Sequence, residues 1–92
     1  MDPTEIRREL ARMARDGSEP VDLIRWLHEE MGDRFSEFTM VAALFEVFDL
    51  PLLSVRRAGG WVGLSPNGYL SDDEVNELLK PLKLRDPEKW SH

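Results

Sequence analysis

Apolar residues recur every three to four positions in the first third of the chain, a spacing typical of amphipathic helices. Pro3 and Pro20 stand where a first helical turn would begin, and Gly17 and Gly32 stand where each helix would end. We therefore predict two helices between these signals. Their inward residues are Ile6, Leu10 and Met13, flanked by Ala11 and Ala14, in the first helix, and Leu23, Ile24, Leu27 and Met31 in the second.

The segment from residue 36 to residue 48 is apolar at nearly every position. Ser36 provides an N-cap, and a helix that is apolar all round is usually buried. We therefore predict a third helix at the centre of the fold. Its expected inward stripe is Phe38, Val41, Leu44, Phe45 and Phe48.

Shorter elements follow. Pro51 can open a short helix that reaches Arg57, after which two glycines break it. A capping box over residues 71–74 starts a last helix, and Pro81 would end or kink it. The inward residues of this helix are Val75, Leu78, Leu79 and Leu82.

Two structures remain open for residues 61–70, which contain the turn signal Asn67-Gly68. The segment is either irregular or a small β-hairpin, although Pro66 interrupts the alternation that a strand requires. Together these patterns predict an all-α fold, a compact bundle of four to five short helices.

The chain length of 92 residues predicts one domain, which we place at residues 1–89. Its final residues, Trp90-Ser91-His92, resemble the start of a streptavidin-binding purification tag. They are either such a remnant or a natural, flexible C-terminus, and the sequence leaves both alternatives open.

Eighteen acidic and 12 basic side chains give a formal net charge of −6, and there is no cysteine. The lack of cysteine excludes disulfides, thiolate zinc sites and cysteine catalysis. The acidic excess makes nucleic acid an unfavourable partner and favours a basic protein. No secretory signal or membrane-spanning stretch occurs in the sequence, so we expect a cytoplasmic protein that binds no membrane.

Two stretches concentrate the acidic side chains on expected helix ends. The partner-binding residues that they predict are Asp72, Asp73, Glu74 and Glu77 in one stretch, and Glu29, Glu30 and Asp33 in the other. Trp61, which follows two glycines, is either a core residue with its N–H group at the surface or an exposed anchor for a partner. We include it among the candidate residues.

Residues 67–74 resemble the second half of an EF-hand loop, with Gly68 at the loop glycine and Glu74 at the bidentate carboxylate. The resemblance implies calcium binding, which also needs oxygen ligands in the first half of the loop. Because Gly63 and Ser65 fall there, we interpret the stretch as a turn followed by a capped helix, and we expect no metal or cofactor.

Residues 41–57 resemble a helix-turn-helix, with the turn at Asp49-Leu50 and a second helix that ends in Arg56 and Arg57. The resemblance implies DNA binding. Sequence readout needs polar side chains near the start of the second helix, where this chain has two leucines. DNA binding therefore stands as an alternative function.

No set of residues matches a nucleophile, phosphate-binding or zinc-protease motif, so we expect no enzyme. In size and charge the chain is similar to the small acidic immunity proteins that neutralise basic bacterial toxins. We therefore predict a protein-interaction domain, monomeric or homodimeric, that inhibits a basic partner by occlusion. A further alternative is an adaptor domain of a signalling or defence assembly.

Overall fold

The computed structural model describes residues 2–90, and it confirms the all-α fold. The five α-helices are α1 (Pro3–Arg15), α2 (Pro20–Met31), α3 (Glu37–Val47), α4 (Leu52–Arg57) and α5 (Asp72–Leu78). Short 3-10 turns at Gly32–Arg34 and Ala58–Gly60 extend α2 and α4. Within the described residues there is no strand, and β-pairing is limited to two isolated bridges.

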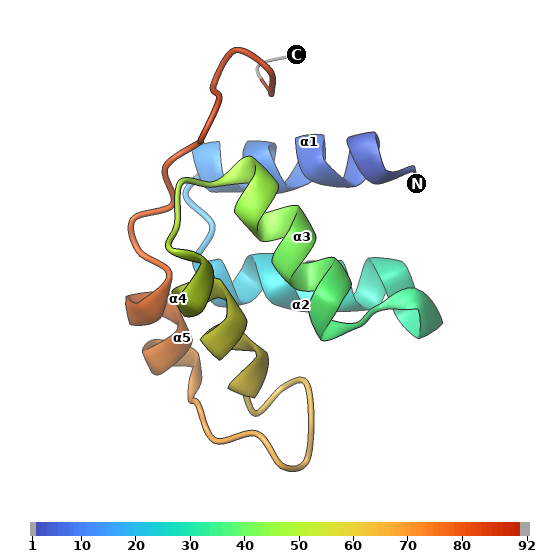
Figure 1. Cartoon of the computed structure of the whole chain (residues 1–92), viewed down its shortest axis with the longest axis vertical. Helices are drawn as coiled ribbons and strands as arrows, with labels where there is room; N and C mark the ends of the chain where they lie inside the picture. Colours follow the sequence, from blue (N-terminus) through green and yellow to red (C-terminus); the bar gives the residue numbers. More distant parts are fainter. Residues whose placement is uncertain (1, 91–92) are drawn as a thin grey trace.

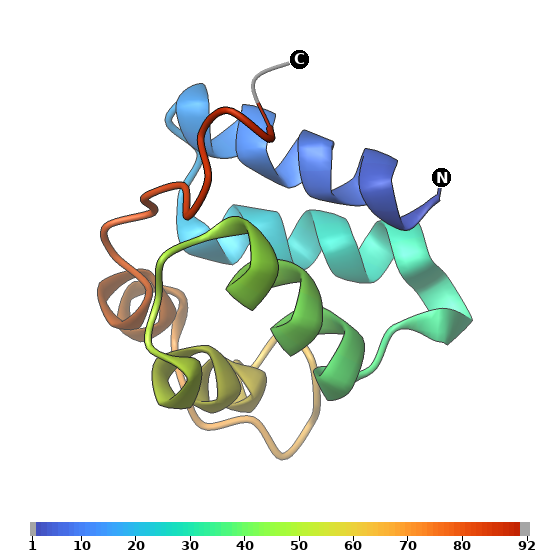
Figure 2. The same cartoon turned by 45° about the horizontal axis from the view of Figure 1, so that its top comes forward.

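The helices form a compact bundle in which α1 and α2 lie antiparallel and α3 packs against α1 (Figures 1 and 2). The short helix α4 packs on α3, and α5 packs on α2. The N-terminal end of α1, the C-terminal end of α2 and the start of α3 lie on the same side of the molecule (Figure 1). The final segment returns to α1 at the top of Figure 1.

Local capping signals place the helix ends where the sequence predicts them. The Asp2 carboxylate accepts the Glu5 amide at 2.9 Å, and the Ser36 hydroxyl accepts the Thr39 amide at 3.1 Å. Gly17 has φ +89° where α1 stops, a left-handed conformation that costs glycine little. Each of these ends satisfies backbone groups that the helix itself leaves unpaired.

The predicted inward stripes of the first two helices are confirmed. Ile6, Leu10 and Ala11 of α1 are buried, as are Leu23, Ile24 and Leu27 of α2. Met13 and Met31 are half-buried at the edge of the same core. These two helices alternate apolar and charged positions, so their sequence defines one face without ambiguity.

The predicted inward stripe of the third helix is confirmed at Leu44 and Phe48, which are buried, and wrong at Phe38 and Phe45. Val41 is half-buried. Met40, Ala43, Leu44 and Val47 are the buried residues of α3, whereas Phe38 is 79% exposed and Phe45 is 37% exposed. Because nearly every position of this helix is apolar, its pattern selects no single face. Contacts with α1 and α4 set the rotation of α3, and one face of the helix remains at the surface.

The C-terminal segment is packed rather than extended into solvent. Leu84 forms an isolated antiparallel bridge with Phe48, and the Arg85 guanidinium donates to the Phe45 and Phe48 carbonyls at 2.9 Å. Trp90 is 2% exposed, and its carbonyl accepts a bond from Arg15 at 2.8 Å. The core therefore includes Trp90, one residue beyond the domain limit that we expected, while Ser91 and His92 lie outside the described residues.

Residues 61–70 are irregular, which is one of the two alternatives that the sequence left open. Trp61 and Leu70 form a single parallel bridge, and the Tyr69 and Leu70 amides both donate to the Gly60 carbonyl. A β-hairpin requires antiparallel pairing, so this loop is not a hairpin. Its close folding brings Trp61 beside the start of α5.

Candidate partner-binding surfaces

Trp61 links the loop, α2 and α5. The ring is 4% exposed, and its indole N–H donates to the Asp72 carboxylate at 2.6 Å. The Arg25 guanidinium of α2 lies 5.2 Å from the ring centroid and 3.5 Å from Asp72. Trp61 is therefore a core residue with its polar group at the surface. In this structure its ring is not available as an exposed anchor.

The same contacts bring the two acidic stretches together. Arg25 and Glu29 lie one turn apart on α2, and both line a shallow hollow with Trp61 and Asp72. Glu29 from one acidic stretch and Asp72 from the other thus share one surface, which the sequence alone does not reveal. Asp72 is engaged by Trp61 and Arg25, whereas Glu29 forms no ion pair or hydrogen bond within the described residues.

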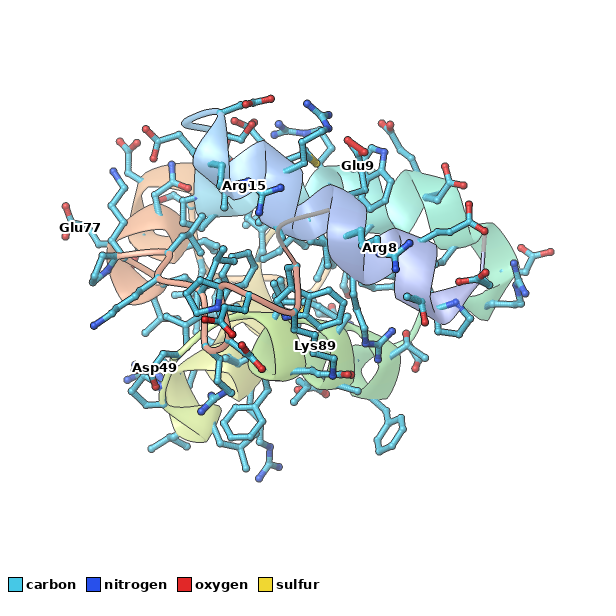
Figure 3. The ribbon with its side chains drawn as sticks, turned by 90° about the horizontal axis from the view of Figure 1, so that it is seen from above. Arg8, Glu9, Arg15, Asp49, Glu77 and Lys89 are labelled. Atoms are coloured by element: carbon cyan, nitrogen blue, oxygen red, sulfur yellow. The ribbon has the colours of Figure 1, made fainter. Side chains whose placement is uncertain are left out.

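The other acidic residues of α5 line a second hollow, which we call the α5 hollow. Its walls carry the carboxylates of Asp73, Glu74 and Glu77 together with Arg57, and Leu70 and Leu78 supply apolar surface. The hollow is open and has a volume of about 440 Å³. Figure 3 shows Glu77 reaching away from α5 into solvent.

The carboxylates of the α5 hollow differ in their availability. Glu74 completes the capping box with Ser71, and hydrogen bonds from the Ser71 backbone and hydroxyl hold the pKa of Glu74 below its ordinary value. Asp73 and Glu77 form no hydrogen bond or ion pair within the described residues. The Lys80 ammonium bonds Glu19 at 2.9 Å, which raises the pKa of Lys80, and Glu77 and Asp73 add to that rise. Asp73 and Glu77 are thus the carboxylates most accessible to a partner's cation.

The remaining acidic candidates lie at the far end of α2. Glu30 and Asp33 are exposed and form no hydrogen bond or ion pair within the part of the chain that the structure describes. They flank Met31, which contributes to an apolar groove between α1, α2 and α3. The second acidic stretch therefore extends from the Trp61 hollow to this groove.

Exposed apolar residues are the feature that the sequence analysis missed. Four large apolar side chains are exposed on α3 and α4, namely Phe38, Phe45, Leu52 and Leu53. Two more, Val62 and Tyr69, are exposed on the loop before α5. Phe38 and Phe45 are seven positions apart and share the outward face of α3. The available signal was that nine of the eleven residues 38–48 are apolar, since one helix face can rarely bury so many large side chains.

The structure bears on both local resemblances. Ser71 and Glu74 exchange capping-box hydrogen bonds with each other's backbone, which accounts for the residues that resemble an EF-hand. In the segment that resembles a helix-turn-helix, α4 has six residues and its first two, Leu52 and Leu53, are exposed leucines. Leucine side chains offer no hydrogen bond to a base edge. DNA binding through residues 41–57 stays an alternative prediction.

Comparison with models of protein families, with curated proteins and with solved structures finds no match to this chain. Among the described residues, no cluster of three or more histidine, aspartate or glutamate side chains is placed to hold a metal ion. Over the same residues, every helix is too short or too polar to cross a lipid bilayer.

Proposed function

We propose that this chain is a small protein-interaction domain that binds a basic protein through the α5 hollow. The observation that carries the proposal is the combination of accessible carboxylates and apolar surface in one place. Asp73 and Glu77 stand beside Leu70 and Leu78 in this hollow. A lysine or arginine side chain matches such a surface, because its stem packs on apolar atoms while its charged head contacts carboxylates.

The charge of the whole chain supports the same proposal. A net charge of −6 attracts a basic partner at long range and raises its association rate, while close contacts set the orientation of the complex. Arg57 is the single cation on the walls of the hollow, and it forms no ion pair within the described residues. Its positive charge repels the cations of a partner, so a partner whose cations contact Asp73 and Glu77 and avoid Arg57 fits best.

The role that fits this binding mode is inhibition by occlusion, as in immunity proteins that cover a basic toxin. A standard interface of about 800 Å² per partner would cover about a seventh of the 5502 Å² surface. A domain of this size can therefore block a partner's site by covering it and needs no catalytic group of its own. In the adaptor alternative, the same surface would recruit the partner into an assembly.

Neutralising Asp73 and Glu77 together is expected to lower capture of the partner at least tenfold. The double variant Asp73→Asn/Glu77→Gln keeps the side-chain shapes and removes two charges from the hollow. We expect wild-type protein, immobilised and exposed to lysate of its source cells, to retain a basic protein that the double variant retains at least tenfold less. Mass spectrometry of the eluates checks this result.

The matched control removes two charges elsewhere. Glu5→Gln/Asp86→Asn changes exposed carboxylates that do not line the α5 hollow. It should capture the same protein as the wild type. Equal losses in both double variants would show that only net charge matters, and retention of an acidic protein or of DNA would refute the proposed partner class.

A further inference from the structure

An apolar groove is lined by residues from the N-terminal half of α1, the C-terminal end of α2 and the first half of α3. Ile6, Met31, Phe38, Thr39, Ala42 and Ala43 line most of it, and we call it the Met31 groove. Its volume is about 200 Å³. A cavity of about 150 Å³ lined by similar residues holds a benzene ring, so the groove has room for one aromatic or leucine side chain.

Phe38 at this groove is 79% exposed. Such a large apolar side chain gains free energy when a partner covers it and removes it from water. Arg7 is the one charged residue of the lining. Its guanidinium forms an ion pair with Glu46 and donates a hydrogen bond to the Pro3 carbonyl. The groove therefore presents uncovered apolar surface and no available charge of its own.

The surroundings of the groove are acidic. Glu30 and Asp33 flank Met31 in the chain, together with one basic residue, Arg34. Both acidic side chains are exposed and form no hydrogen bond or ion pair within the described residues. The negative end of the α2 dipole adds to this field. A ligand that places an apolar residue in the groove gains further if cations flank that residue.

From this complementarity we infer that the Met31 groove binds an amphipathic, basic helix of a partner protein. One large apolar side chain of the helix enters between Met31 and Ala42 and stacks on Phe38, and lysine or arginine residues one turn away contact Glu30 and Asp33. A second copy of this chain fits poorly, because it would bring its own Glu30 and Asp33 against the same two residues of the first copy. The groove shares no lining residue with the α5 hollow, so this inference goes beyond the proposed function.

A titration of the isotope-labelled protein with model helices tests the inference. The probes are three peptides of about 18 residues, each designed as a helix with two different faces. The first peptide has a leucine face and a lysine face, the second a leucine face and a glutamate face, and the third a serine face and a lysine face. We expect the leucine–lysine peptide to shift the amide resonances of Ile6, Met31, Thr39 and Ala42. The other two peptides should bind at least tenfold more weakly at these residues.

Two variants assign the binding to the groove. Ala42→Phe fills the groove and Phe38→Ser removes its exposed ring, and each should weaken the leucine–lysine peptide at least tenfold. Leu53→Ser, which removes an exposed apolar residue outside the groove, should leave its affinity within twofold. Circular dichroism confirms that each variant is folded.

The Asp73→Asn/Glu77→Gln background separates this inference from the proposed function. Groove binding should persist in that double variant, because its substitutions lie in the α5 hollow. The inference is overturned if the serine–lysine peptide binds the groove residues equally well, if the shifts fall only on α5, or if light scattering shows dimers that Phe38→Ser dissolves.

Discussion

Replacing Trp90 by alanine is expected to lower the free energy of unfolding by about 3–5 kcal/mol, the usual cost of deleting a buried tryptophan. Trp90 is 2% exposed, and Lys89 places its ammonium 4.8 Å from the ring centroid. Domains of this size are stable by about 5–15 kcal/mol. The loss of one residue near the end of the chain should therefore remove a large part of the stability. Urea unfolding followed by circular dichroism measures this change.

Two substitutions serve as controls for Trp90. Lys89→Ala changes an exposed neighbour, whose ion pair with Glu46 at 3.3 Å should contribute at most about 1 kcal/mol. Trp90→Phe should cost less than Trp90→Ala, because the buried indole N–H has no hydrogen-bond partner among the described residues and its removal relieves that penalty. A loss below about 1 kcal/mol for Trp90→Ala would contradict the burial of this ring.

Trp61→Ala is expected to have a similar effect on stability, about 3–5 kcal/mol, for a different reason. Its ring fills the space between α2 and α5, and its N–H group bonds the Asp72 carboxylate. Removing the ring leaves a cavity and also deprives Asp72 and Arg25 of their shared neighbour. Tryptophan fluorescence and urea unfolding measure the loss.

Asp72→Asn is the companion variant for Trp61. It retains an oxygen that can accept the indole bond but weakens the contact with Arg25, so we expect a loss below about 1.5 kcal/mol. The capture of a basic partner should survive this substitution, because Asp72 does not line the α5 hollow. Equal destabilisation by Trp61→Ala and Asp72→Asn would show that the hydrogen bond, rather than the ring, dominates.

Short-range signals explain why most of the fold could be predicted from the sequence. Capping by Ser36 and Ser71 depends on residues three positions away, and chain reversal at Gly17 depends on one backbone angle. The alternation of apolar and charged residues in α1 and α2 identifies their buried faces. Each of these features acts within a few residues, so a single sequence contains all the information that is needed.

Features that depend on packing between distant residues could not be predicted in this way. The largely apolar α3 gives no preferred face, so its rotation and the exposure of Phe38 emerge only when α1 and α4 are in place. The sequence allowed Trp61 to be either buried or exposed. Trp61 contacts Arg25, which lies 36 positions earlier in the chain, and no local pattern encodes a contact between residues so far apart. The acidic stretches were recognised individually, but their meeting at Glu29 and Asp72 results from the packing of α5 on α2.

The dependence of the association rate on salt tests the α5 hollow as the binding site most directly. With the captured partner, we expect the association rate constant to fall at least tenfold as salt rises from about 0.05 to 1 M, because the Debye length shortens to about 3 Å. Asp73→Asn/Glu77→Gln should flatten this dependence, while Glu5→Gln/Asp86→Asn should retain most of it. A rate that salt leaves unchanged, or an equal flattening in both double variants, would show that the α5 hollow is not the binding site.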